Sequence, residues 1–202
     1  MIAPNYPEGA TPLDPNELGG LKYRHITTQA ELDELEQANI TSGLLWLSRT
    51  RRKDILTDGF AIELHQRLFG EVWNWAGIFR TTGKNIGVDP VQIGVQLRAA
   101  LDDGLYWMDH GTYAPVEAAV RLHHRVVFIH PFANGNGRYA RILADAMLEK
   151  LYGVDPIDWT AGADLLKMNE RRAAYIAALK AADRHDIGPL LAFAGLAGQV
   201  QS

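Results

Sequence analysis

Apolar residues recur three and four positions apart over most of the chain, which is the spacing of amphipathic helices. The 202-residue sequence predicts helices over about residues 29–49, 58–69, 91–110, 115–129, 138–152, 162–183 and 187–199. Thr28 and Glu31 have the spacing of a capping box at the start of the first of these helices. Asp58 is expected to cap the second helix, and Gly70 to end it in the left-handed conformation.

Two stretches depart from the helical pattern. Residues 1–27 contain four prolines and several glycines, and we expect them to form an extended arm ahead of a single helical domain over residues 28–202. Between residues 71 and 90, β-branched residues lie on both sides of Gly83, which predicts a short β-hairpin. The expected fold class is therefore all-α, a helical bundle with one hairpin.

Composition narrows the function classes. The chain is 47% hydrophobic and 22% charged, with a net charge of −4, which is typical of a soluble globular domain and disfavours a direct nucleic-acid interface. The absence of cysteine excludes disulfides and thiolate metal sites. No run of eighteen apolar residues and no secretory signal occurs in the sequence, so we expect a cytoplasmic protein with no membrane partner.

One segment carries the chemistry: His130 to Arg141 reads His-Pro-Phe-Ala-Asn-Gly-Asn-Gly-Arg-Tyr-Ala-Arg. Gly135 and Gly137 allow consecutive backbone N–H groups to point into one concavity, and the following helix start adds its own unpaired N–H groups. Arg138 and Arg141 lie one turn apart on that helix and can reach phosphate oxygens, while His130 suits proton abstraction. A plain glycine turn between packed helices is the alternative, but it explains neither the histidine nor the paired arginines.

This segment resembles the signature of Fic-domain proteins, His-Pro-Phe-x-Asp/Glu-Gly-Asn-Gly-Arg-x-x-Arg, and matches it at every position but one. The order of expected elements over residues 28–195 is also similar to the Fic fold, a helical bundle with a β-hairpin flap. Residues 8–14, 35–40 and 84–87 further resemble a Fic subgroup called mobile mystery protein B, which is found on mobile elements.

The resemblance implies transfer of AMP from ATP to a Ser, Thr or Tyr hydroxyl of a target protein. It implies His130 as the general base. Residues 84–87 would be the flap that pins an extended segment of the target: Lys84, Asn85, Ile86 and Gly87. The implied nucleotide-binding residues are Phe132, Gly135, Asn136, Gly137, Arg138 and Arg141. Transfer of UMP, phosphate or phosphocholine stays open, as does a weakly active nucleotide-binding protein with an antitoxin-like or regulatory partner.

Two positions bear on activity within this resemblance. Asn134 replaces the family's metal-holding Asp or Glu, and its neutral oxygen is a weaker ligand for Mg²⁺ than a carboxylate. Glu36 aligns with an inhibitory glutamate present in many Fic proteins, and we expect it to contact Arg141; a solvated helix glutamate is the alternative. One of His123 and His124 is expected to pack against the active loop, and a metal site formed by them is disfavoured because adjacent residues of a helix point in different directions. His65 carries no functional signal.

Overall fold

The computed structural model describes residues 12–159 and 168–196. Its helices are α1 (Pro15–Leu18), α2 (Gln29–Arg49), α3 (Asp58–Phe69), α4 (Ile93–His110), α5 (Pro115–Ile129), α6 (Asn136–Met147), α7 (Met168–Ala182) and α8 (Gly188–Phe193). A 3₁₀ turn, η1 (Pro90–Gln92), precedes α4, and a π-helical turn, η2 (Leu148–Tyr152), continues α6. The expected helical bundle is confirmed, and most of its boundaries follow the apolar periodicity; the expected last helix is shorter than predicted, because α8 ends at Phe193 and residues 194–196 are not helical.

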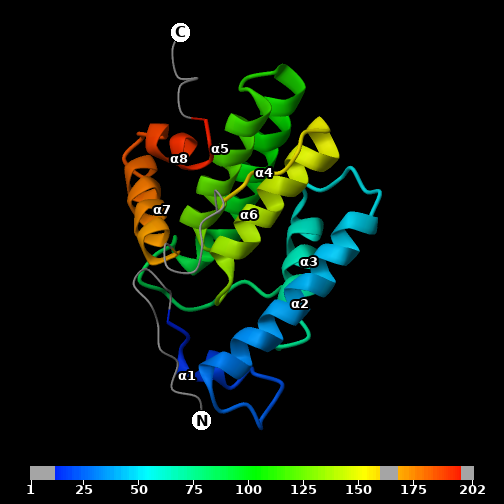
Figure 1. Cartoon of the computed structure of the whole chain (residues 1–202), viewed down its shortest axis with the longest axis vertical. Helices are drawn as coiled ribbons and strands as arrows, with labels where there is room; N and C mark the ends of the chain where they lie inside the picture. The colour runs from blue at the N-terminus through cyan, green and yellow to red at the C-terminus, as the bar shows by residue number, and fades with distance from the viewer. Residues whose placement is uncertain (1–11, 160–167, 197–202) are drawn as a thin grey trace.

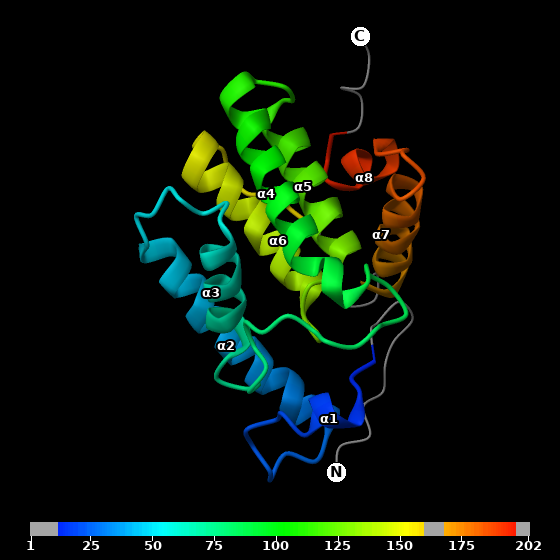
Figure 2. The ribbon, with the colours of Figure 1, turned by 180° about the vertical axis from the view of Figure 1, so that it is seen from behind.

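The helices α4, α5 and α6 form the middle of the molecule, with the α2–α3 pair on one side and the α7–α8 pair on the other (Figures 1 and 2). The larger apolar core lies among α2 to α6, and a smaller one lies where α5 and α6 meet the last two helices. Of the helices in the described ranges, none is both long enough and apolar enough to cross a bilayer.

The expected β-hairpin at residues 71–90 is not formed, and the described residues contain no β-sheet. The backbone of this segment bonds to other parts of the chain: Arg80 N donates to Pro131 O at 3.0 Å, and Val88 N donates to Ile129 O at 3.3 Å. Both bonds join the segment to the end of α5 and the residues that follow it, so its two halves do not pair with each other. The segment runs beneath the ends of α5 and α6, on the side of α1 (Figures 1 and 2).

The described part of the arm is also more structured than its prolines predict. Pro15 occupies the first position of the one-turn helix α1, where its missing N–H costs nothing. The Glu17 carboxylate accepts a 2.7 Å bond from Asp14 N, which stabilises the start of that turn. Residues 1–11, 160–167 and 197–202 lie outside the described part of the chain, as do the parts of the arm and of the last two expected helices that fall there.

Helix caps account for the small boundary differences. Thr28 and Glu31 form the expected capping box of α2. Thr57 caps α3 in place of Asp58, and Gly70 ends that helix in a right-handed conformation with φ −73°. Helix α6 begins at Asn136, two residues before the expected start, because Gly135 with φ 78° serves as its N-cap.

Candidate active site

Helix α5 ends at His130, which has a left-handed backbone conformation with φ 54° and ψ 61°. A residue with a β-carbon adopts this conformation at a cost, so the surroundings must hold it in place. The side chain is 5% exposed. Burial first, and then the nearby charges of Arg80 and Lys84, lower the pKa of the imidazole to about 4. His130 is thus a neutral imidazole at physiological pH.

The loop of residues 131–135, here called the site loop, joins α5 to α6. Its shape is held by the buried side chain of Asn136, which accepts from Phe132 N at 2.9 Å and donates to Phe132 O at 2.8 Å. Gly135 has φ 78°, and a β-carbon there would lie 2.6 Å from the Phe69 ring, so only glycine fits. The loop therefore presents the first turn of α6, with its unpaired N–H groups, in one fixed orientation.

Phe132 does not fit the nucleotide-binding role that the resemblance implies. Its ring is fully buried and stacks on His65 with a centroid separation of 3.7 Å. The side chain anchors the site loop to the core and is not available to a ligand. The side chain of Asn136 is likewise used within the loop, so its contribution to anion binding would come from its backbone.

Arg138 and Arg141 extend from the first two turns of α6. The Arg138 guanidinium lies 5.0 Å from the centre of the Phe69 ring, and its Nη2 is 2.7 Å from Glu36 Oε2. Arg141 lies 5.4 Å from the ring centre of Tyr175 on α7. The two cations therefore lie on the same helix but have different partners.

The expected contact of Glu36 with Arg141 is not the one observed, because Glu36 pairs with Arg138. The carboxylate is buried between α2 and α6, and its other oxygen accepts a 2.7 Å bond from the indole Nε1 of Trp73. Since Trp73 directs the carboxylate, the residue is fixed rather than solvated. The Trp73 role was not visible in the sequence, where its position favours a core anchor.

Residues 84–87 lie directly against His130, as a flap would. Gly87 has φ 103°, and a β-carbon on it would lie 2.7 Å from the His130 β-carbon. Lys84, whose side chain is 3% exposed, is covered by the arm. Its ammonium bonds to Pro12 O at 3.2 Å, to Asp14 Oδ2 at 3.1 Å and to the Glu17 carboxylate.

Two buried residues that the sequence does not mark as functional, His65 and Arg80, support the site loop and the end of α5. His65 Nε2 lies 3.1 Å from Asn134 O, and its Nδ1 accepts a 3.0 Å bond from Gly77 N. Burial lowers the pKa of His65 to about 3, so its ring stays neutral. Arg80 bonds to carbonyl oxygens at the end of α5. A histidine on the apolar face of α3 is the only sign in the sequence that His65 has a special role. Arg80 has no such sign, because it lies in the segment that was expected to form a hairpin.

The described residues do not form a protein-held Mg²⁺ site. Asn134 Oδ1 accepts a 2.5 Å bond from Gly135 N, so this neutral oxygen is already used to shape the site loop. Within residues 12–159 and 168–196, no group of three or more His, Cys, Asp or Glu side chains is arranged to hold a metal ion. The expectation that Asn134 is a metal ligand is therefore not supported by its geometry.

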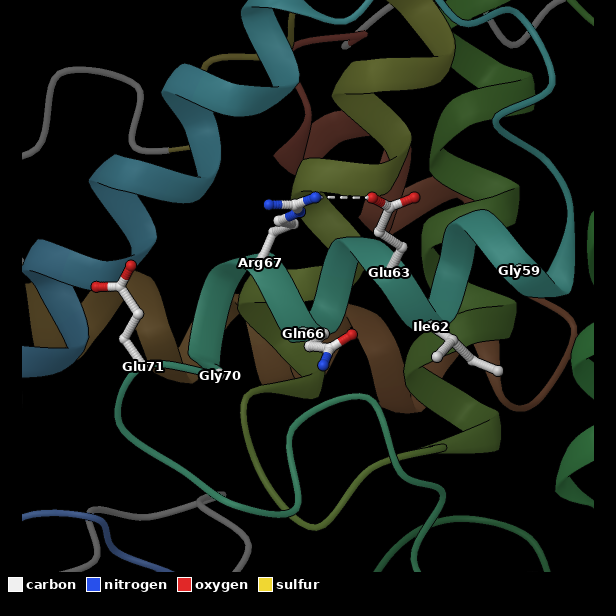
Figure 3. A pocket seen from close by; sticks show the side chains of 7 residues that line it. All are labelled: Gly59, Ile62, Glu63, Gln66, Arg67, Gly70 and Glu71. Carbon is white, nitrogen blue, oxygen red and sulfur yellow. Dashed lines mark hydrogen bonds and ion pairs between the residues drawn. The ribbon is translucent and has the colours of Figure 1, made fainter.

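A separate hollow of about 610 Å³ lies along α3, lined by Gly59, Ile62, Glu63, Gln66, Arg67, Gly70 and Glu71 (Figure 3). Glu63 and Arg67 form a 3.1 Å ion pair beside it. None of the candidate catalytic, nucleotide-binding, flap or metal residues lines this hollow. We therefore locate the candidate site at the junction of α5 and α6.

These features define a helical domain in which a histidine at the end of one helix is followed by a short loop and a helix whose first two turns bear two arginines. The sequence model of the Fic/DOC family matches residues 55–148, a range that contains α5, the site loop and α6. The resemblance seen in the sequence is thus confirmed at the level of the family. Assignment to the mobile mystery protein B subgroup stays a prediction.

The relatives share the fold and part of the sequence. The chain is 28% identical over 169 residues to a protein adenylyltransferase Fic of Nematostella vectensis, in a match that covers 80% of this chain and 37% of the relative. The solved structure of Fic-1 from C. elegans gives a TM-score of 0.61 at 28% identity, over 79% of this chain and 46% of that one. BepC of Bartonella tribocorum, solved with bound AMPPNP, gives a TM-score of 0.68 at 15% identity, over 91% and 98% of the two chains.

The curated relatives are much longer than this chain, which spans between 25% and 37% of their length. At 15% identity, the similarity to BepC establishes the fold alone.

Proposed function

We propose that this chain transfers AMP from ATP to a Ser, Thr or Tyr hydroxyl of a target protein. The observation that carries the proposal is the short, pinned loop that joins the neutral His130 to the first turn of α6, from which Arg138 and Arg141 extend. The Nematostella vectensis relative is named a protein adenylyltransferase, which supports the same reaction class.

In this proposal the arginines and the helix start hold the triphosphate. The guanidinium groups of Arg138 and Arg141 neutralise the β- and γ-phosphates, and backbone N–H groups of the Gly135–Gly137 turn form the anion hole; that of Gly135 must first leave Asn134 Oδ1. Charge neutralisation and positioning supply most of the catalysis in reactions of this kind. The anionic triphosphate also raises the pKa of the adjacent His130, which makes the imidazole a stronger base in the complex than in the free protein.

His130 then accepts the hydroxyl proton of the target. The hydroxyl oxygen forms a bond to the α-phosphorus, the bond from that phosphorus to the oxygen bridging to the β-phosphate breaks, and pyrophosphate leaves with the electron pair. The proton remains on the imidazole until solvent removes it. Residues 84–87 are proposed to hold an extended segment of the target by strand-like pairing beside His130.

Glu36 is proposed to keep the protein inactive in the absence of ATP. Its carboxylate occupies Arg138, so a γ-phosphate can reach that guanidinium only after the ion pair opens. Inhibition by Glu36 was also the expectation from the sequence, but the arginine that it pairs with is Arg138 and not Arg141.

A weakly active nucleotide-binding protein is the second candidate function. Asn134 favours it, because an amide in place of a carboxylate lowers the affinity of the site for Mg²⁺ and its Oδ1 is engaged by Gly135 N. Such a protein would act through an antitoxin-like or regulatory partner rather than through turnover.

Incubation of the purified chain and a cell lysate with ATP labelled at the α- or the γ-phosphate separates these candidates. Retention of the α-label on protein supports AMP transfer, and retention of the γ-label identifies a phosphotransferase. Absence of both labels with the wild type and with Glu36→Gly favours binding alone. His130→Ala should abolish transfer and keep ATP binding, with the exposed His110→Ala as the matched control; full transfer by His130→Ala would overturn the mechanism.

A further inference from the structure

Arg80 is a buried cation whose acceptors are backbone carbonyl oxygens. Its side chain is 4% exposed. Nε donates to His130 O at 2.6 Å, Nη1 donates to Thr82 O at 2.8 Å, and Nη2 donates to Ile129 O at 3.3 Å and to Val88 O. Burying a guanidinium is costly unless its donors are satisfied, and four carbonyl oxygens satisfy it here.

These four carbonyl oxygens belong to two structures of the site. Those of Ile129 and His130 are at the C-terminal end of α5, where helical carbonyl groups lack intrahelical partners and the helix dipole favours a cation. Those of Thr82 and Val88 flank the flap of residues 84–87. One planar guanidinium therefore links the residue that carries the imidazole to both ends of the flap.

The backbone conformations at this point depend on such a link. His130 is left-handed with φ 54°, and Gly87 has φ 103°. A β-carbon on Gly87 would lie 2.6 Å from Arg80 Nη2 and 2.7 Å from the β-carbon of His130, so the three residues are in direct contact. The bond from Nε to the His130 carbonyl holds the residue in a conformation that it would otherwise leave.

Arg80 also acts on His130 electrostatically. After burial, its charge is the largest cause that lowers the pKa of the imidazole, to about 4. Lysine could supply a charge but not four directed donors, because only a guanidinium presents donors in a fixed planar fork. The position therefore requires both the charge and the shape of arginine.

We propose that Arg80 is a positioning residue of the transfer reaction, which fixes His130 and the flap relative to each other through their backbone carbonyl groups. This inference rests on the proposed function, since the flap and the base are roles within it. Arg80 itself does not touch the reacting atoms. Its removal should impair the chemical step far more than the binding of ATP, because Arg138 and Arg141 lie on α6 and none of the four side-chain hydrogen bonds of Arg80 goes to that helix.

The test compares Arg80→Lys and Arg80→Gln with Arg98→Gln, a control at an exposed arginine of α4. Transfer is measured in the Glu36→Gly background. We expect kcat to fall at least about tenfold in both variants, since small misplacements of reacting groups have effects of this size, while KM for ATP stays within about twofold. Unchanged kcat in Arg80→Lys and Arg80→Gln would overturn the proposal.

A second readout does not require activity. NMR titration of the His130 imidazole should show a neutral ring from pH 8 to pH 5 in the wild type and in Arg80→Lys. In Arg80→Gln the titration should move to higher pH by about one unit, because a nearby cation is lost. If the wild type transfers nothing, the proposed function fails, and this titration still decides whether Arg80 controls His130. An unchanged titration in Arg80→Gln would contradict the inference, and Arg80→Lys keeps the kinetic test available if the Gln variant does not fold.

Discussion

Glu36 on α2 and Arg138 on α6 form a 2.7 Å ion pair, and the indole of Trp73 holds the same carboxylate from the other side. The pair joins two helices that are far apart in the sequence, since α2 ends at Arg49 and α6 begins at Asn136. It also occupies one of the two guanidinium groups that a triphosphate would need. A substitution that breaks this ion pair is therefore the most direct test of inhibition by Glu36.

Glu36→Gly should increase automodification by about tenfold. The variant frees Arg138 for phosphate, and a charge-assisted hydrogen bond at a partly solvated guanidinium is worth about 1.5 kcal/mol, or a factor of about ten. The rate of incorporation of α-labelled AMP at low ATP concentration measures the effect. Equal rates for the variant and the wild type would refute the inhibitory role.

Glu34→Gly is the matched control for this change. Glu34 is exposed on the same helix, two residues away, and its replacement by glycine has the same backbone cost of about 1 kcal/mol. Trp73→Phe tests the support of Glu36, because it removes the indole N–H and keeps an aromatic ring. We expect Trp73→Phe to raise the rate less than Glu36→Gly and more than Glu34→Gly.

Lys84→Met should release the arm from the flap. The ammonium of Lys84 is buried against Asp14 and Glu17, and its removal leaves both carboxylates without this partner. Local opening of the arm then requires less free energy. Trypsin should cleave after Lys22 and Arg24, which are exposed, at least about threefold faster than in the wild type.

Lys180→Met, at an exposed position of α7, is the control for the loss of one positive charge. A cleavage rate in Lys84→Met that equals the rate in this control would show that Lys84 does not hold the arm. The two variants have the same net charge, so a general electrostatic effect on the protease cancels in the comparison.

The sequence predicts the helices well because their buried apolar residues recur every three or four positions, a pattern that is visible within a short stretch of sequence. The apolar spacing of α5 and α6 marks both helices, and Gly135 and Gly137 mark the turn between them. Neither pattern specifies partners that are far apart in the chain. The pairing of Glu36 with Arg138 rather than Arg141 depends on how α2 crosses α6, and that crossing has no signature in a local window.

The hairpin expectation failed for a related reason. The β-branched residues near Gly83 favour extended backbone, and the backbone is extended or turning there. Tertiary packing decides which backbone groups an extended segment bonds to. Here the backbone N–H groups of Arg80 and Val88 donate to Pro131 O and Ile129 O, instead of joining the two halves of the segment. A buried arginine such as Arg80 is equally hard to anticipate, because its acceptors are carbonyl groups that every residue has.

Acid should destabilise the fold through its buried histidines. Burial lowers the pKa of His65 and His123 to about 3 and that of His130 to about 4, all below the ordinary 6.5. Between about pH 6.5 and 4 these histidines are protonated in the unfolded chain but not in the folded chain. The free energy of unfolding therefore decreases as the pH falls. The contribution of Asp145 to this pH dependence has the opposite sign. Burial raises its pKa to about 6, so as the pH falls the folded chain binds this proton before the unfolded chain does.

Three histidines less one aspartate leave a net uptake of about two protons on unfolding near pH 5. The free energy of unfolding should therefore decrease by about 2.7 kcal/mol per pH unit there. Urea titrations at pH 7.5, 6.0 and 5.0 measure this slope. His123→Phe should reduce it by about half and the exposed His110→Gln should leave it unchanged; stability that does not vary between pH 7 and pH 5 would contradict the assignment.

His65→Phe should weaken the site loop while it keeps the packing. A phenyl ring can still stack on Phe132, but Asn134 O and Gly77 N both lose the partner that His65 supplies. Each buried polar group left without a partner costs about 1 to 3 kcal/mol, so we expect the free energy of unfolding to fall by about 2 kcal/mol or more.

Because Asn134 precedes the first turn of α6, the same change should also lower the affinity for AMPPNP, measured by calorimetry. His65→Gln, which retains a donor and an acceptor, should recover part of both losses. His110→Phe controls for the introduction of an aromatic ring. If His65→Phe bound AMPPNP as tightly as His110→Phe, the imidazole would be a packing residue of α3 with no part in orienting the first turn of α6.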